Sequence, residues 1–256
     1  MAIGSGSMYA QYRLANKREV VVLPDGITPA QGAAAFVNPM TALAFTETMR
    51  AEGHSAIVHT AAASNLGQML VKLCAKDNVP LVNIVRSAAQ VKILKDLGAE
   101  TVLDSSTPEF TSQLIAAVTA TKATLAFDAI AGGTMASQIL HAMEVACSAG
   151  KPYNRYGSTT HKQVYIYGTL DTSPTVLHRN FGFAWGCGSW LVTYALAKMP
   201  GETVMKIRGR VLSELTTTFA STYTQTISLR EAIQPDVLAR YVKKATGEKF
   251  LIDPSK

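Results

Sequence analysis

Residues 56–67 read Ala-Ile-Val-His-Thr-Ala-Ala-Ala-Ser-Asn-Leu-Gly, and this segment is the most informative about the fold. It opens on a short apolar run, continues through small residues, and leads into a helical pattern from Ser64 to Ala75. An apolar run without polar alternation is typical of a strand buried on both faces of a parallel sheet. The stretch therefore predicts a strand, a tight turn and a helix, which together open a βαβ unit.

The same alternation continues along the chain. Apolar runs recur at 81–85, 101–103, 125–127 and 164–167, and helical patterns recur at 88–97, 107–119 and 135–145. Thr107 and Pro108 predict a capped start for the helix that follows them. Strands that alternate with helices of this length indicate right-handed βαβ units. We therefore predict an α/β fold, a doubly wound parallel sheet of the Rossmann type, over residues 55–200.

The two ends of the chain do not fit this sheet. They predict short strands at 8–14, 20–22, 221–229 and 250–252 and helices at 202–215 and 237–244. Thr28 and Pro29 predict a further helix start, and Ala-rich sequence follows to about Met49, interrupted at Asn38-Pro39. These strands have no partners in a six-stranded Rossmann sheet. We interpret them as remnant strands of a second, mostly absent lobe.

Composition excludes several classes of protein. Of 256 residues, 48% are apolar and 16% charged, which excludes disorder. Three scattered cysteines are too few for a disulfide framework or a zinc cluster, and they suit a reduced compartment, so we expect a cytoplasmic protein. We expect no membrane span and no signal peptide at residues 1–8. Gly4–Ser7 reads equally well as an added linker or a native loop.

The net charge of +6 is concentrated in one stretch. Residues 151–210 hold eight basic and two acidic side chains, a net of +6, while 1–150 sum to −1 and 211–256 to +1. We favour a solvated face over nucleic-acid binding, because no arginine-rich tract or nucleic-acid motif is present. A surface that faces an anionic ligand is the second interpretation.

Ligands of such folds bind at the carboxyl ends of the strands. Against the G-x-G-x-x-G fingerprint, the first turn keeps only Gly67, with Ala62 and Ser64 in the other two places. Small residues still let the backbone approach a pyrophosphate, Ser64 and Asn65 offer polar side chains, and the helix start attracts anions. Gly67 permits close packing of helix on strand. An ordinary tight turn is the alternative, but its place after the first strand favours nucleotide binding.

The second apolar run ends in Arg86-Ser87, where an NAD-specific enzyme would carry an acidic residue. A carboxylate there would repel a 2′-phosphate, whereas an arginine attracts it and can bind it through two hydrogen bonds. The alternative is an ordinary surface arginine. The position favours NADPH as the cofactor.

An ordered series of short motifs points to a family. The series comprises residues 9–12 (YAQY), 23–26 (LPDG), 38–42 (NPMTA), 61–67, 97–99 (LGA), 127–129 (FDA), 166–168 (IYG) and 247–250 (GEKF). It resembles the medium-chain dehydrogenase/reductase superfamily, and within it the zinc-free quinone oxidoreductase and enoyl reductase branch. The resemblance covers nearly the whole chain. It implies three parts: 1–30, the end of a GroES-like catalytic domain otherwise absent; 31–215, the NADP-binding Rossmann domain with a hinge helix; and 216–256, a segment returning to the catalytic lobe.

The resemblance also implies roles for individual residues. The implied cofactor-binding residues are Asn38, Thr41, Ala63, Ser64, Asn65, Leu66, Gly67, Arg86, Ser87, Asp128, Ala129, Tyr167, Gly168, Thr169 and Lys249. Residues 64–67 would cradle the pyrophosphate, Asp128 and Ala129 would border the path from adenine to ribose, and 167–169 would flank the nicotinamide ribose. A loop carboxylate and a solvated cation are the alternatives for Asp128 and Lys249. Residues 181–190 would hold an edge strand that pairs subunits; a mobile loop is the equal alternative.

The resemblance implies no metal. The cysteine that zinc alcohol dehydrogenases carry shortly before the position of Thr41 is missing, and the five histidines show no ligand spacing with the cysteines. Enoyl reductases of the branch use a tyrosine from the absent region, so no catalytic residue is assigned. His59 is interpreted as a packing residue, and Tyr167 as lining the nicotinamide end.

The predicted function is NADPH-dependent, zinc-independent hydride transfer to a small-molecule quinone or an activated C=C bond, by a homodimer. The alternative is an NADP(H)-binding homologue without turnover. The substrate cannot be predicted further, because its contacts would lie in the absent region.

Overall fold

The computed structural model describes residues 2–3, 8–17, 20–243 and 245–256. The chain divides into two compact units, one of residues 42–199 and one that combines 1–41 with 200–256. Gly4–Ser7, predicted to be a linker or a loop, lie outside the described residues. The division into three domains inferred from the resemblance stays a prediction.

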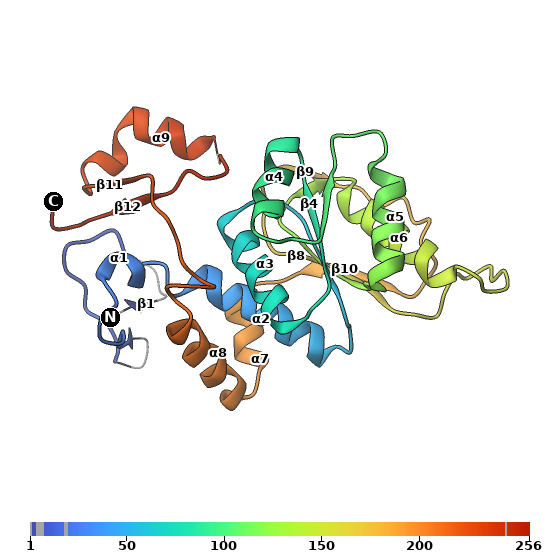
Figure 1. The fold of residues 1–256 in the computed structure, drawn as a ribbon, viewed down its shortest axis with the longest axis horizontal. Coiled ribbons are helices and arrows are strands. Elements are labelled where there is room, and N and C mark those ends of the chain that lie inside the picture. Colours follow the sequence, from blue (N-terminus) through green and yellow to red (C-terminus); the bar gives the residue numbers. More distant parts are fainter. Residues whose placement is uncertain (1, 4–7, 18–19, 244) are drawn as a thin grey trace. The chain divides into compact units, whose positions relative to one another are not determined.

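Residues 42–199 form a six-stranded parallel sheet. Its strands are β3 (Ile57–His59), β4 (Leu81–Val85), β5 (Thr101–Asp104), β6 (Leu125–Asp128), β8 (Lys162–Ile166) and β10 (Trp185–Ser189). They lie side by side in the order β10-β8-β6-β3-β4-β5, and every pair is parallel (Figure 1). The chain begins this sheet in the middle, builds one half and returns to build the other. The predicted doubly wound sheet is confirmed.

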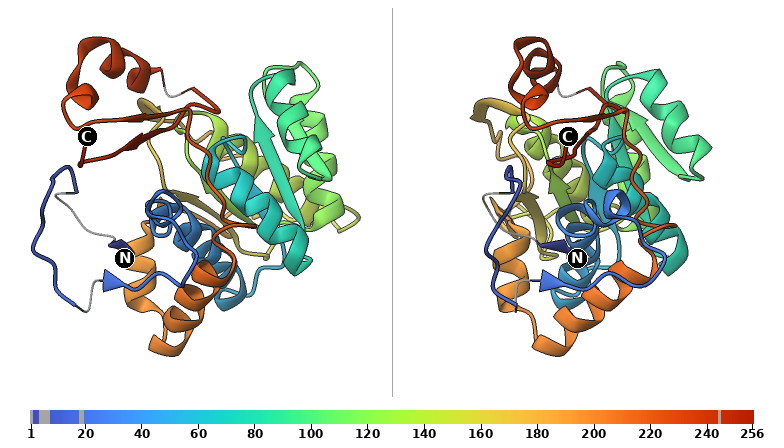
Figure 2. Two further views of the ribbon diagram at one scale, coloured as in Figure 1. Left: turned by 60° about the vertical axis from the view of Figure 1, so that its left-hand side comes forward. Right: turned by 90° about the vertical axis from the view of Figure 1, so that its left-hand side faces the viewer.

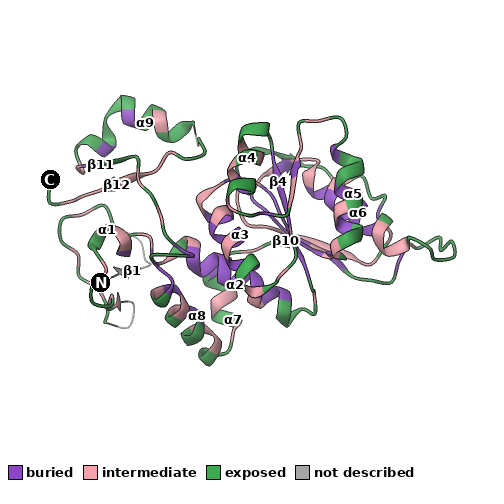
Figure 3. Ribbon diagram, viewed as in Figure 1, coloured by how far each residue is buried: buried purple, intermediate pink, exposed green. Residues whose placement is uncertain are grey.

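Helices cover both faces of this sheet (Figures 1 and 2). They are α3 (Asn65–Asp77), α4 (Ala88–Asp96), α5 (Phe110–Thr121) and α6 (Met135–Ser148). Val58 and Ile84 point into a core with Leu114 and Ile139 from α5 and α6. Residues such as Val85 pack on the α3 and α4 side. The central strands β3, β4 and β6 are therefore buried on both faces (Figure 3), which explains their unbroken apolar runs.

Several local predictions for this unit need correction. The helix at 107 begins at Phe110 and has no side-chain cap, because Thr107 Oγ1 donates to Asp104 O of the preceding strand instead. Of the two interpretations of residues 181–190, the edge strand agrees with the structure, since β10 (Trp185–Ser189) is the sixth strand of the sheet and lies at its edge; the pairing of subunits through it stays a prediction. Three elements were not predicted: β7 (Ala131–Gly133), β9 (Asp171–Thr175) and α7 (Val192–Lys198). β7 and β9 pair in parallel as a separate two-stranded sheet.

The Ala-rich stretch forms two helices, α1 (Pro29–Gly32) and α2 (Val37–Ala51). Thr28 caps α1 as predicted, in a capping box with Gln31. The predicted interruption at Asn38-Pro39 is wrong, because both residues lie in the first turn of α2. Proline is tolerated there, since the first N–H groups of a helix have no partner within it.

The unit of residues 1–41 and 200–256 contains small sheets. β1 (Ala2–Ile3) pairs with β2 (Val20–Val21) in antiparallel, and β11 (Gln225–Ile227) pairs with β12 (Phe250–Ile252) in parallel. Its helices are α8 (Gly201–Ser213), the 3-10 helix η1 (Glu231–Ile233) and α9 (Pro235–Val242). The strand predicted at 8–14 is wrong, and the one predicted at 221–229 shrinks to β11. Each described strand of this unit has its partner within the unit.

Candidate functional site

The order of strands reverses between β3 and β6, and ligands of open α/β sheets bind at this point, outside the carboxyl ends of the strands. We call the carboxyl ends of β3, β4, β6 and β8, with the residues that follow them, the strand-end site. The turn after β3 opens with Ala61 in the left-handed region, at φ 49°. The next residue, Ala62, donates its N–H to Ile84 O of β4 at 3.1 Å. The turn is therefore anchored to the neighbouring strand.

Ser64 and Gly67 join this turn to α3. Ser64 is the N-cap, and its Oγ accepts a hydrogen bond from Gly67 N–H at 3.2 Å. A Cβ on Gly67 would lie 2.0 Å from the carbonyl oxygen of Ala62, so only glycine fits there. Gly67 thus allows the close packing of helix on strand that the sequence predicts. The positive end of the α3 dipole lies at the strand-end site, where it favours an anionic group.

The other residues of this turn are mostly covered. Ala63 and Leu66 are buried, and Asn65 is the first residue of α3. Backbone groups, rather than these side chains, would therefore contact a pyrophosphate. The predicted cradle at residues 64–67 stays a prediction.

A buried network joins the ends of β3 and β6. Thr60 Oγ1 donates to Asp128 Oδ1 at 2.6 Å and accepts from Ala129 N–H at 2.8 Å. The Asp128 carboxylate also accepts the N–H groups of Ile130 and Ala131, at 3.0 and 3.1 Å. Asp128 is fully buried. Its carboxylate therefore fixes the loop after β6, and sequence reasoning missed Thr60, its main partner.

Arg86 follows β4 with an exposed side chain. Its backbone N–H donates to Gln90 Oε1 at 3.1 Å, and no residue in the described ranges pairs with its guanidinium. Ser87 is the N-cap of α4 and accepts from Gln90 N–H at 3.4 Å. Among the described residues, this cation at the strand-end site is therefore without an acidic partner, and it lies beside the start of α4. That Arg86 and Ser87 bind a 2′-phosphate stays a prediction.

Tyr167 follows β8, and its hydroxyl lies 2.7 Å from Nε2 of His59, the last residue of β3. Gly168 lies so close to the next loop that a Cβ would come within 2.8 Å of Ala129 O. Thr169 is exposed. The structure therefore brings the predicted residues after β6 and β8 together. The interpretation of His59 as a packing residue is right about its burial but missed its hydrogen bond.

An aromatic cluster surrounds this pair. Phe45 of α2 stacks on Phe127 of β6 with ring centroids 3.7 Å apart, and lies edge-on to Tyr167 at 4.9 Å. Burial lowers the pKa of His59 to about 3, so its ring is neutral at pH 7. Burial, and then the charge of Asp128, raise the pKa of Tyr167, so the phenol keeps its proton.

Three predicted site residues lie in the other unit. Thr41 Oγ1 donates to Val37 O of its own helix at 2.6 Å, and Asn38 is half-buried in the same turn. Lys249 Nζ donates to Ser221 Oγ at 3.0 Å. Each is therefore described within residues 1–41 and 200–256 only, and their cofactor contacts stay predictions.

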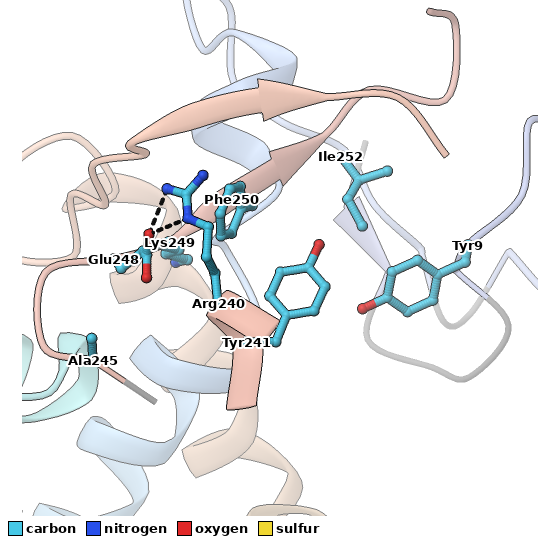
Figure 4. A pocket seen from close by; sticks show the side chains of 8 residues that line it. All are labelled: Tyr9, Arg240, Tyr241, Ala245, Glu248, Lys249, Phe250 and Ile252. Atoms are coloured by element: carbon cyan, nitrogen blue, oxygen red, sulfur yellow. Dashed lines mark hydrogen bonds and ion pairs between the residues drawn. The ribbon is translucent and has the colours of Figure 1, made fainter. Parts of the chain in front are cut away.

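Lys249 also lines a pocket of about 300 Å³ in that unit (Figure 4). Arg240 lies over the Phe250 ring, 4.3 Å from its centroid, and its Nη2 pairs with Glu248 at 2.5 Å. Lys249 Nζ lies 5.1 Å from the Tyr223 centroid, and burial lowers the pKa of Lys249. Lys249 is thus not the solvated cation that the sequence left as an alternative.

The described residues contain no group of three or more histidine, cysteine or acidic side chains placed to hold a metal ion. None of their helices is long and apolar enough to cross a membrane.

The strand-end site fits a dinucleotide phosphate. The Gly67 turn has no room for a side chain, α3 offers the positive end of its dipole, and Arg86 offers a cation that has no partner in the described part of the chain. The site thus combines backbone, dipole and guanidinium donors for anionic oxygens.

No protein-family model and no curated protein matches the sequence. Solved structures do match. A proposed NADPH:quinone reductase from Mesorhizobium loti is 26% identical, with 93% of this chain and 64% of that chain covered, at a TM-score of 0.75. A mycobacterial protein solved with NADPH is 16% identical (91% and 66% covered, TM-score 0.62). A mutant enoyl thioester reductase from Candida tropicalis is 18% identical (90% and 62% covered, TM-score 0.61).

This chain therefore spans less than two thirds of the Mesorhizobium loti structure that it resembles. It shares the fold of the quinone oxidoreductases and enoyl reductases of the medium-chain dehydrogenase/reductase superfamily, as its motifs predict.

Proposed function

We propose that this chain binds NADPH at the strand-end site and serves as an oxidoreductase. The observation that carries the proposal is the switch point of the doubly wound sheet, with a glycine-dependent turn on one side and, on the other, the Arg86 guanidinium, which no described residue pairs. The mycobacterial neighbour solved with NADPH supports this choice of cofactor.

Each part of the site has a task in this proposal. The start of α3, from Ser64 to Gly67, binds the pyrophosphate, and Arg86 binds the 2′-phosphate. Residues 167–169 orient the nicotinamide, while the Thr60–Asp128 network holds the loops between which it lies. When bound, NADPH supplies a hydride, so the protein needs mainly to position and shield it.

For the substrate we propose a quinone or an activated C=C bond. The support is the names of the solved neighbours, a quinone reductase and an enoyl thioester reductase. A homodimer and a cytoplasmic location belong to the same proposal.

Binding without turnover is the second candidate, and one observation favours it. At the strand-end site, the Tyr167 hydroxyl and the Asp128 carboxylate, two groups that could move a proton, already have partners in the fold: Tyr167 bonds His59, and Asp128 bonds Thr60 and two backbone N–H groups. Loss of NADPH absorbance with a simple benzoquinone separates the two candidates, because only turnover consumes the cofactor.

Replacing Arg86 tests the proposal. A phosphate near −2 distinguishes NADPH from NADH, and a charge-assisted hydrogen bond is worth about 1.5–3 kcal/mol. Arg86→Asp should therefore weaken the binding of NADPH by roughly ten- to a hundredfold and the binding of NADH far less. Calorimetry at one fixed salt concentration gives both dissociation constants.

Lys151→Asp is the matched control, since it makes the same charge reversal at an exposed residue beyond the end of α6. It should leave the ratio of the two constants unchanged. If Arg86→Asp weakens both cofactors equally, Arg86 does not bind the 2′-phosphate. A folded wild-type chain that binds neither cofactor at millimolar concentration overturns the proposed function.

A further inference from the structure

His59 carries a polar atom that the fold does not use. The residue is fully buried, and its Nε2 bonds the Tyr167 hydroxyl, yet its Nδ1 has no partner within the described part of the chain. A neutral imidazole has one N–H and one lone pair. Whichever nitrogen holds the proton, one buried donor or acceptor stays unsatisfied, and such groups destabilise a fold. A phenylalanine would fill this aromatic cluster without that cost.

The hydrogen bond gives direction to a ring that is otherwise held by contacts without direction. The Tyr167 ring stacks on His59 with centroids 5.7 Å apart and lies edge-on to Phe45. Such ring contacts tolerate rotation and sliding, whereas the 2.7 Å bond to Nε2 fixes where the hydroxyl lies. His59 therefore determines the orientation of the tyrosine.

The bond also ties together two segments that leave the sheet. His59 is followed directly by the turn of Thr60–Gly67, and Tyr167 by Gly168 and Thr169. Tyr167 N–H donates to Asp128 O at 2.9 Å, so the loop after β6 is held to the same segment. One pair of side chains thus links the phosphate side of the strand-end site to the end of β8.

We propose that His59 is a positioning residue: by bonding Tyr167 it holds residues 167–169 where the nicotinamide half of NADPH binds. This inference rests on the proposed function and adds a division of labour to it. The adenosine half depends on Arg86, and the nicotinamide half depends on the His59–Tyr167 bond.

Two ligands separate the halves. NADPH contains both, whereas adenosine 2′,5′-bisphosphate carries the adenine, the ribose and the 2′-phosphate but no nicotinamide. His59→Phe keeps a ring and removes the bond, so NADPH should bind about three- to tenfold more weakly, the value of one net hydrogen bond, while the bisphosphate changes less than about twofold. Tyr167→Phe, which removes one oxygen atom, should show the same selective loss.

His59→Gln is the rescue variant, because an amide oxygen can accept the Tyr167 hydroxyl in place of Nε2. It should restore most of the NADPH affinity. His54→Phe is the matched control: His54 Nδ1 also lies 2.7 Å from a hydroxyl, that of Thr124, but before the start of β3 rather than at its carboxyl end. It should leave both affinities unchanged.

Every outcome of these binding measurements either supports or overturns the inference. A loss of affinity for NADPH but not for the bisphosphate in His59→Phe supports the inference. If that variant does not fold, the same selective loss in Tyr167→Phe supports it. An equal loss of affinity for both ligands, or no loss of affinity for either, overturns the inference, while the proposed cofactor binding stands. A folded wild-type chain that binds neither ligand overturns the proposed function, and this inference with it.

Discussion

The two ends of the six-stranded sheet satisfy their buried polar groups differently. At the amino end of β8, the fully buried Lys162 Nζ donates to Glu144 Oε2 at 2.5 Å, to Ser158 Oγ at 3.0 Å and to Thr160 O at 3.1 Å. The Glu144 carboxylate also accepts from Ser158 N–H and from the Ser148 hydroxyl, both at 2.7 Å. The buried charges at this end form a closed network.

At the carboxyl ends of the strands, buried polar groups are only partly paired. His59 Nδ1 has no partner among the described residues, although Thr60 and Asp128 beside it are well bonded. Proteins tend to break their own packing rules at functional sites. The difference therefore indicates that the amino end serves stability, while the carboxyl end gives up stability to hold a binding geometry.

Breaking the closed network should have the largest effect. Lys162→Met leaves the buried Glu144 carboxylate without its cation, which typically lowers the free energy of unfolding by about 3–5 kcal/mol. Because the change is at the amino end, the NADPH affinity of the folded variant should stay within about twofold of wild type. Urea denaturation and calorimetry measure the two quantities.

Lys151→Met is the control, because it removes an exposed cation near the same end of the sheet. It should change the free energy of unfolding by less than about 0.5 kcal/mol. If Lys162→Met weakened NADPH binding strongly without loss of stability, the assignment of stability to this end would be wrong.

Acid should distinguish the two ends. The pKa of His59 is about 3 in the fold, because of burial, and 6.5 in the unfolded chain. In the unfolded chain, His59 therefore binds a proton below pH 6.5, whereas in the folded chain it stays unprotonated down to about pH 3. Stability that is present above pH 6.5 is lost as the pH falls through this window, by about 2 kcal/mol between pH 7 and pH 5. His59→Phe should show a correspondingly smaller loss in urea titrations at these two pH values.

The amino end should respond at lower pH. Burial opposes ionisation of Glu144, but the hydrogen bonds from Lys162, Ser148 and Ser158 prevail and lower its pKa from 4.5 to about 2. The stability it contributes is complete above pH 4.5 and is lost as the pH falls toward 2. Burial also lowers the pKa of His54 from 6.5, so this histidine contributes a loss of stability of its own as the pH falls below 6.5, and His54→Phe measures that share. An unchanged pH dependence in His59→Phe would show that burial does not lower the pKa of His59 in the fold.

The sequence was informative where burial leaves a local pattern. Five of the six strands of the parallel sheet followed from unbroken apolar runs, and Gly67 followed from the turn that needs it. The sixth strand, β10, was implied only by the resemblance. β7 and β9 left no such pattern: β9 (Asp171–Thr175) is exposed along its whole length and exists through its pairing with β7. Neither propensity nor periodicity reports a pairing of that kind.

The candidate site could be predicted in outline only. Arg86 and the turn at 61–67 are contiguous motifs, and their place at the strand ends follows from the fold. The His59–Tyr167 and Thr60–Asp128 bonds join residues 108 and 68 positions apart. They depend on which strands lie side by side, so a single sequence contains no local signal for them.

The smallest expected effect concerns which cation at the carboxyl end meets a phosphate. Lys92 on α4 is the nearest rival to Arg86 in sequence, but its Nζ already pairs with Asp96 at 2.8 Å, and both side chains are exposed. An exposed pair one helical turn apart contributes less than about 0.5 kcal/mol, and salt screens it. Lys92→Ala should therefore barely change the free energy of unfolding, and it should weaken the binding of NADPH by less than about threefold. Arg86→Ala, measured beside it at the same salt concentration, should weaken NADPH binding by roughly tenfold or more, because no described residue pairs with the Arg86 guanidinium. Equal effects of the two variants would mean that the phosphate is attracted by the general charge of α4, and the carboxyl end would then lack the specific anion contact that sets it apart from the amino end.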